Sequence, residues 1–257
     1  MALFNSGNTG NPALSEKTFK SITYTSSSND VMTARGTMNK FGFMSIMLVA
    51  GALFSWKAFY DTAPYAQSLM WIGGIGGFIC ALIMIFKQDS ARYLAPAYGV
   101  LEGLFLGAIS AMYNYVFSER MPNIIINSVA LTLGTVVAMF FLYRFQIIKA
   151  TERFKSIIIT ATAAIAVFYL VVMVLRLFNV QVPFMHDSSP LGIGISLFVV
   201  GIASMNLILD FDMIEKGAAQ GAPKYMEWYG AFGLMVTIVW LYLEILRLLS
   251  RFAGSRN

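Results

Sequence analysis

The chain has few of the side chains on which membrane-embedded enzymes depend. Its 257 residues include one histidine and one cysteine, whereas a zinc hydrolase needs several such ligands. No intramembrane histidine or lysine is placed to activate a serine nucleophile. The last apolar stretch lacks the lysine of a retinal Schiff base, and the Gly-x-Gly-Asp element of intramembrane aspartyl proteases is missing. We therefore expect no enzymatic activity and no cofactor, with Cys80 as a packing residue and His186 as a solvated loop residue.

Charged residues are also scarce. They make up 12% of the chain, while 58% of the residues are hydrophobic and the mean hydropathy is +0.68. Soluble domains contain roughly 25% charged residues. A membrane-spanning helix needs about 20 mostly apolar residues, and the sequence contains seven such segments. They cover residues 41–59, 68–86, 95–113, 124–143, 156–175, 191–214 and 233–252.

These segments predict an all-α integral membrane protein, a seven-transmembrane helix bundle with its last helix at the centre. Residues 1–38 are polar and contain no apolar core for a signal peptide, so we expect a disordered cytoplasmic tail followed by a transmembrane domain over 39–257. Lysines and arginines gather in this tail and in alternate loops, which places the N-terminus in the cytoplasm. Arg247, Arg251 and Arg256 then fall on the opposite side, a conflict that a re-entrant last segment would remove. Because these loops account for the net charge of +5, the expected partner is the lipid bilayer and not nucleic acid.

Three carboxylates interrupt the apolar segments. Asp210 lies in 191–214, Glu244 in 233–252 and Glu102 in 95–113. An acid in a membrane span costs roughly 2.5 to 3.5 kcal/mol on insertion scales, so each acid marks a candidate functional site. We expect Asp210 and Glu244, which lie in consecutive segments, to be the working part of the molecule.

The neighbours of Asp210 indicate which way it faces. Asn206 lies one helical turn before it, so the two belong to a polar stripe suited to a bundle interior. Asp212 points about 200° away. We expect Asp212 at the cytoplasmic interface, in an ion pair with Lys216 four residues on.

Glu244 has two possible partners. Arg247, three residues on, could form a structural salt bridge with it, because intramembrane charges tend to pair. Contact with Asp210 requires a similar depth in the membrane, which a helix beginning at Met226 would prevent. We prefer an arrangement in which residues 224–229 form an interfacial turn and the span covers 233–252.

Glu102 is surrounded by glycine. Gly99, Gly103 and Gly107 have the spacing that lets another helix approach closely, and glycines at 73–77 repeat this device in the second segment. Whether Glu102 lines a pore or makes a structural hydrogen bond is left open by the sequence.

Four stretches of the chain are distinctive: MTARGTMNK, PAYGVLEGLFLGAIS, NLILDFDMIEKGAAQGAPKYMEWYGAFG and WLYLEILRLL. They resemble the Bax inhibitor family of seven-span membrane proteins, in its bacterial YccA-like branch. The resemblance implies a calcium pore with a pH sensor in which two acids of the sixth and seventh spans share a proton. Asp210 then takes the first acidic position, and Glu244 takes the second, where the family more often has aspartate. The basic residue that locks the closed state is matched by Lys87, with Arg92 as a competing candidate.

The function expected from this resemblance is a pH-sensitive calcium-leak channel, a monomer in the bacterial inner membrane. Two carboxylates in a low dielectric cannot both ionise cheaply, so Asp210 and Glu244 would titrate as a unit and bind Ca²⁺ transiently. One alternative is a regulator of a membrane-anchored AAA protease, since YccA-like relatives resemble such modulators. Another is a proton-coupled secondary transporter, although the sequence shows no inverted repeat.

Overall fold

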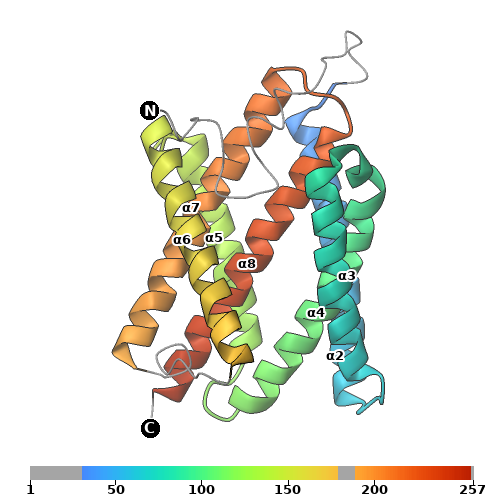
Figure 1. The fold of residues 1–257 in the computed structure, drawn as a ribbon, viewed down its shortest axis with the longest axis vertical. Helices are drawn as coiled ribbons and strands as arrows, with labels where there is room; N and C mark the ends of the chain where they lie inside the picture. The colour runs from blue at the N-terminus through green and yellow to red at the C-terminus, as the bar shows by residue number, and fades with distance from the viewer. Residues whose placement is uncertain (1–30, 179–188, 256–257) are drawn as a thin grey trace. The chain divides into compact units, whose positions relative to one another are not determined.

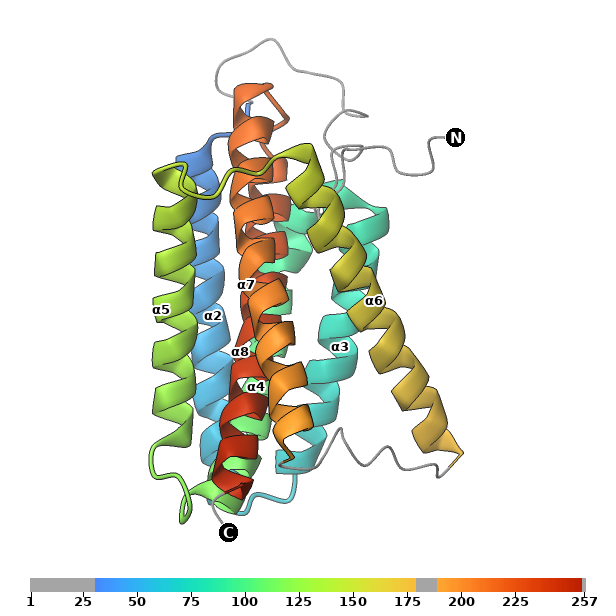
Figure 2. The same ribbon diagram turned by 90° about the vertical axis from the view of Figure 1, so that its left-hand side faces the viewer.

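The computed structural model describes residues 31–178 and 189–255. Over these residues it contains seven long helices, shown in Figure 1 and Figure 2: α2 (Ala34–Tyr60), α3 (Ala66–Phe86), α4 (Ala91–Phe117), α5 (Ile124–Arg144), α6 (Glu152–Leu177), α7 (Pro190–Ala219) and α8 (Met226–Gly254). A short 3-10 helix, η1 (Gln88–Ser90), joins α3 to α4. The described residues form no strand.

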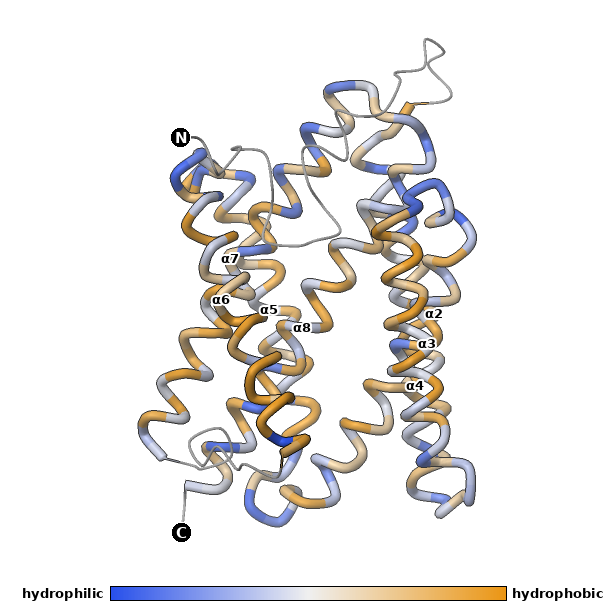
Figure 3. The backbone as a smooth tube through the Cα atoms, viewed as in Figure 1, coloured by the Kyte–Doolittle hydropathy of each residue, from blue (hydrophilic) through white to orange (hydrophobic). Residues whose placement is uncertain are grey.

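All seven long helices are long and apolar enough to cross a membrane. Each of the seven predicted segments lies inside one of them, so the seven-helix prediction is confirmed. Figure 3 shows hydrophobic residues along the middle of the helices and hydrophilic residues gathered toward helix ends and connections. The apolar window of α8 is 67% buried, the largest share among the seven. The central position of the last helix stays a prediction.

Two helices begin earlier than the sequence predicted. α2 begins at Ala34, because the Thr33 hydroxyl accepts a hydrogen bond of 3.0 Å from the Gly36 N–H and caps the first turn. Residues 34–38 of the expected tail are therefore helical, whereas residues 1–30 and His186 lie outside the described residues. α8 begins at Met226, so the preferred arrangement with a non-helical turn through residue 229 was wrong.

The described residues divide into two compact units, and the boundary between them runs through α7 and α8. Unit 1 contains residues 117–178, 189–211 and 237–255, and unit 2 contains residues 31–116 and 212–236. Each long helix other than α7 and α8 belongs essentially to one unit.

In unit 2, glycine lets α4 approach both α2 and α3. A Cβ atom on Gly103 of α4 would lie 2.2 Å from the carbonyl oxygen of Leu48 in α2. A Cβ atom on Gly73 of α3 would lie 2.5 Å from the carbonyl oxygen of Leu101 in α4. Because only glycine permits such contact, the close helix packing predicted from the glycine spacing is confirmed.

Unit 1 is held by an apolar core between α6 and α7. Its buried members are Ile158, Ile165, Val199, Ile202 and Leu209, and partly buried Tyr169 and Trp240 pack against them. Trp240 belongs to α8, so α6, α7 and α8 enclose one core. This core fixes the backbone from which the buried polar groups of unit 1 project.

Candidate functional site

Asp210 lies on α7 in unit 1 with none of its surface exposed. Asn206, one turn earlier, is 1% exposed and donates hydrogen bonds to the hydroxyl of Thr162 in α6 (2.8 Å) and to the carbonyl of Ile202 (2.9 Å). The predicted position of this polar stripe in the protein interior is confirmed. The stripe also ties α7 to α6 through a neutral hydrogen bond.

Glu244 lies on α8 in the same unit and is 2% exposed. Arg247 donates from Nη1 to both carboxylate oxygens, at 2.9 and 3.0 Å. The hydroxyl of Tyr169 in α6 donates to Oε1 of Glu244 at 2.9 Å. The salt bridge with Arg247, which the sequence offered as one of two possibilities, is therefore present.

Tyr169 was missed by the sequence analysis. Its hydroxyl also accepts a hydrogen bond of 2.7 Å from Arg247, and the guanidinium carbon lies 5.2 Å from the centre of the Tyr169 ring. Glu244, Arg247 and Tyr169 thus contact one another in all three pairs, and we call them the Glu244 triad. Because Tyr169 lies 75 residues from Glu244, no local spacing in the sequence points to this contact.

Asp210 and Glu244 lie in one compact unit, both withdrawn from solvent. α8 begins at Met226, the start that the sequence analysis took to prevent contact between these two acids. A proton shared between their carboxyl groups stays a prediction. Within residues 31–178 and 189–255, no group of three or more His, Cys, Asp or Glu side chains could hold a metal ion. The transient calcium contact predicted for Asp210 and Glu244 involves two acids only and also stays a prediction.

The remaining predicted acids lie in unit 2. Asp212 is 9% exposed and forms the expected ion pair with Lys216, at 2.7 Å. Glu102 of α4 points at α3, because a Cβ atom on Gly77 would lie 2.9 Å from its Oε2. This contact explains why a glycine stands opposite Glu102, whereas a pore-lining role for the acid stays a prediction.

The two candidates for a basic latch lie next to one another in unit 2, at the junction of α3 and α4. Lys87 is exposed and ends α3, its N–H donating to the carbonyl of Ile83 at 2.7 Å. Arg92 is exposed in the first turn of α4, with its guanidinium 4.7 Å from the centre of the Tyr93 ring. The latch role of either residue stays a prediction.

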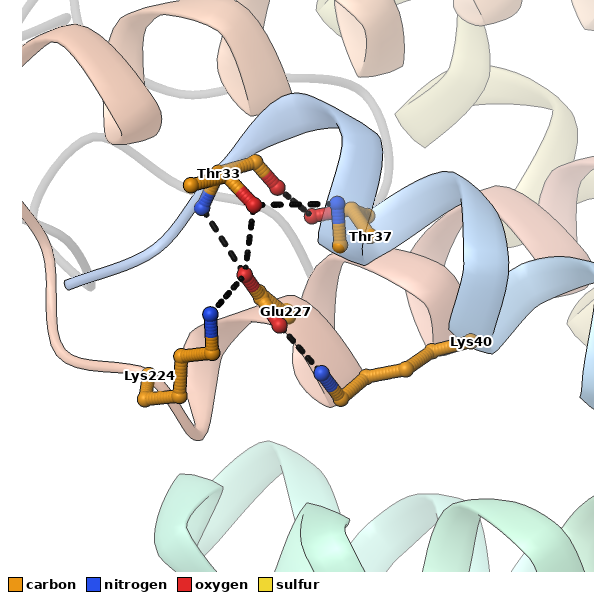
Figure 4. Close-up of polar contacts among 6 residues, drawn as sticks. Thr33, Thr37, Lys40, Lys224 and Glu227 are labelled. Atoms are coloured by element: carbon orange, nitrogen blue, oxygen red, sulfur yellow. Dashed lines mark hydrogen bonds and ion pairs between the residues drawn. The ribbon is translucent and has the colours of Figure 1, made fainter. Parts of the chain in front are cut away.

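A second group of buried charge, which the sequence analysis did not find, surrounds Glu227 in the first turn of α8. Figure 4 shows Thr33 and Lys40 of α2 and Lys224 of the preceding loop pointing toward its carboxylate. The backbone N–H and the hydroxyl of Thr33 donate at 2.9 and 2.8 Å, Lys224 pairs at 3.0 Å, and Lys40 forms a further ion pair. Glu227 itself has no exposed surface. Lys224, three residues before Glu227, was the only nearby residue in the sequence that could have indicated this cluster.

Arg251, near the end of α8, is also buried. It is 6% exposed and donates a hydrogen bond to the carbonyl oxygen of Gly192 in the first turns of α7. The orientation prediction had placed Arg247 and Arg251 on the side opposite the cytoplasm. Both donate hydrogen bonds to groups of unit 1.

The fold and these buried charges define a class, that of polytopic helical membrane proteins with ionisable groups inside the protein. The family model described as Bax inhibitor 1 like matches residues 11–254. The chain belongs to this family and is a multi-pass membrane protein, as the resemblance implied. The chain matches none of the curated proteins.

Proposed function

We propose that this protein is a pH-sensitive calcium-leak channel of the bacterial inner membrane, in which Asp210 and Glu244 control opening. The observation that carries the proposal is the burial of both acids in one compact unit, at 0% and 2% exposure. Acids buried in membrane spans are expensive to keep, and they mark ion pathways and proton-sensitive elements in other membrane proteins.

In the proposed gate, Glu244 has a counter-ion on its own helix, Arg247, and Asp210 supplies the charge that changes with pH. At low pH a proton held between the carboxyl groups of Asp210 and Glu244 keeps α7 and α8 together. Loss of that proton at higher pH leaves two carboxylates, and Arg247 neutralises the one on Glu244. The hydrogen bond that held α7 to α8 is then lost, and the negative charge left on Asp210 attracts a divalent cation, which favours an open, calcium-conducting state.

Flux measurements in liposomes test this gate. The double variant Asp210→Asn with Glu244→Gln removes both titrating groups at nearly constant volume. Calcium efflux from vesicles loaded with a fluorescent indicator should rise with pH for the unaltered protein. The double variant should give a flat pH profile, because no carboxyl group remains to lose its proton.

Glu119→Gln is the matched control for this experiment, since it neutralises an exposed acid between α4 and α5. It should leave the pH profile unchanged. An unaltered profile in the double variant would discard the gating role of Asp210 and Glu244.

Two alternative functions, regulation of a membrane protease and proton-coupled transport, would then be tested in place of the calcium-leak channel. Regulation of a membrane-anchored protease predicts that pull-down of the protease depends on the N-terminal tail. The truncation should remove residues 1–30 and not 1–38, because the longer cut would delete Thr33 and expose the Glu227 carboxylate. Proton-coupled transport predicts saturable uptake that supports counterflow, which a leak channel does not.

A further inference from the structure

The connection between α5 and α6, residues 145–151, joins the ends of these two helices in unit 1 (Figure 2). Three cations lie on it or beside it: Arg144 at the end of α5, Lys149 in the connection and Arg153 in the first turn of α6. All three residues are exposed. The proposed calcium gate uses none of them.

The negative charge of this region is directed at a buried lysine. Glu152 is the only acid in residues 144–155. Its carboxylate pairs with Lys155 at 3.2 Å, and the Lys155 side chain is only 3% exposed. When this pair is counted as neutral, the three exposed cations give the region a positively charged surface.

Large apolar side chains lie among these cations. Phe145 and Ile147 are each 68% exposed. Phe145 stacks on Phe141 of α5, with 5.8 Å between the ring centres, and Phe141 is itself 49% exposed on a membrane-spanning helix. The apolar surface of α5 therefore continues into the connection. Exposed apolar side chains beside exposed cations are typical of segments at the boundary between hydrocarbon and headgroups.

Hydrogen bonds within unit 1 fix the backbone of the connection. The N–H of Ile147 donates to the carbonyl of Leu142 at 3.0 Å, and the N–H of Thr151 donates to the carbonyl of Lys149 at 2.8 Å. Gln146 turns the chain with a left-handed conformation, at a φ of 54°. Because this backbone is ordered before a ligand arrives, less entropy is lost when one binds.

The first turn of α6 adds to the attraction for an anion. α6 is 26 residues long, and the N–H groups of its first turn lie at the positive end of the helix dipole. Arg153 places a further positive charge at that end, where a cation is disfavoured unless an anion accompanies it. The side-chain charges and the helix dipole therefore favour an anion at the same place.

The apolar and the cationic residues of this region together form what we call the α5–α6 surface: Arg144, Phe145, Ile147, Lys149 and Arg153. We propose that the α5–α6 surface binds an anionic phospholipid such as phosphatidylglycerol. The cations contact the lipid phosphate, while Phe145 and Ile147 pack against the upper part of the acyl chains. Phosphatidylcholine carries a choline cation beside its phosphate and fits a positive surface less well. Lipid binding here does not depend on the calcium-leak function proposed above.

The double variant Arg144→Gln with Lys149→Gln tests this proposal in the full-length protein purified in detergent. Phosphatidylglycerol is added in rising amounts, and native mass spectrometry counts the lipid molecules bound to each protein. A cation near an anionic lipid surface strengthens binding by about fivefold. We therefore expect the double variant to bind phosphatidylglycerol roughly 10- to 30-fold more weakly. Its binding of phosphatidylcholine should stay unchanged.

Lys57→Gln with Arg120→Gln is the matched control, because it also removes one exposed lysine and one exposed arginine. Lys57 lies in the last turn of α2, and Arg120 lies between α4 and α5. The control should bind phosphatidylglycerol as the unaltered protein does. An equal loss in both double variants would show that the lipid responds to net charge alone, which overturns the assignment to the α5–α6 surface.

Two further measurements apply if Arg144→Gln with Lys149→Gln does not fold. Arg153→Gln alone should weaken the binding of phosphatidylglycerol by about fivefold. Raising the ionic strength from about 0.1 M to about 1 M shortens the screening length from roughly 10 to 3 Å, so it should release the lipid from the unaltered protein. Binding that survives both changes overturns the proposal.

A soluble competitor distinguishes a lipid from a free phosphate compound. Glycerol 3-phosphate offers the same phosphate without acyl chains, so at equal concentration it should not displace phosphatidylglycerol. Displacement would assign the surface to a soluble phosphate ligand and overturn the proposal, as would an unchanged phosphatidylglycerol affinity in a folded Arg144→Gln with Lys149→Gln protein. None of these measurements involves calcium flux, so each result leaves the proposed channel function to its own test.

Discussion

Helix α8 carries two buried glutamates whose surroundings differ. Glu227 in the first turn is bonded to Thr33 and Lys40 of α2 and to Lys224 of the preceding loop. Glu244, further along, has one arginine from its own helix and one tyrosine from α6. Both side chains are withdrawn from solvent, at 0% and 2% exposure, so burial alone does not tell their roles apart.

The origin of the positive partners distinguishes the two acids. Lys40 lies 187 residues from Glu227 in the chain, and Thr33 lies 194 residues away, so this cluster joins the start of α2 to the start of α8. Arg247 lies three residues from Glu244, and 34% of its side chain is exposed. An acid bound by two cations from separate segments is suited to hold structure, whereas an acid with one partly solvated cation can exchange partners.

The largest effect should follow neutralisation of Glu227. Glu227→Gln removes both ion pairs and places an amide near Lys40, and we expect a loss of about 2 to 4 kcal/mol, because hydrogen bonds to charged groups contribute more than neutral ones. Thermal unfolding in detergent, with Glu119→Gln as the exposed control, measures this loss. Equal unfolding temperatures for the two variants would show that the Glu227 cluster does not stabilise the fold.

A smaller effect should follow from crowding the same cluster. The Cβ atom introduced by Gly36→Ala would lie 2.1 Å from Oε1 of Glu227, so the carboxylate must leave its partners or the helix must shift. We expect a loss of about 1 to 3 kcal/mol. Gly42→Ala, on the same helix with nothing within 4 Å of its added Cβ, should unfold at the original temperature or slightly above it. A similar response from both variants would mean that the cluster tolerates displacement.

The smallest effect should come from the Glu244 triad. Arg247→Lys keeps the positive charge but loses the planar group that contacts the Tyr169 hydroxyl and ring. We expect a loss of about 1 kcal/mol, near the usual size of polar interactions between membrane helices. Unfolding in the same detergent provides the measurement. A loss of stability as large as that of Glu227→Gln would show that the Glu244 triad stabilises the fold as strongly as the Glu227 cluster does.

The features predicted correctly from the sequence depend on residues close together in the chain. The ion pair between Asp212 and Lys216 follows from a spacing of four residues on a helix, and the structure contains it. The seven spans follow from local hydropathy, which directly reflects the preference of each segment for lipid. The close approach at Gly103 follows from the spacing of the glycines around it.

The features that were missed depend on residues that only the fold brings together. The start of α8 was misplaced because Glu227 is satisfied by groups of α2, which makes a helical first turn favourable at an acidic residue. Tyr169 was missed because its partners lie on another helix, and hydropathy does not distinguish it from other aromatic residues of a span. Long-range polar contacts of this kind are not encoded in any local period of the chain.

The hydrogen bond between Arg251 and Gly192 bears on how the topology of such proteins is read from their charges. The positive-inside rule counts the lysines and arginines near each end of a span and assigns the richer side to the cytoplasm. The rule presumes that each counted side chain interacts with water and lipid headgroups. A guanidinium enclosed by the protein and bound to a backbone carbonyl does not meet that condition. Leaving Arg251 out of the count therefore removes one of the three arginines that conflict with the orientation prediction.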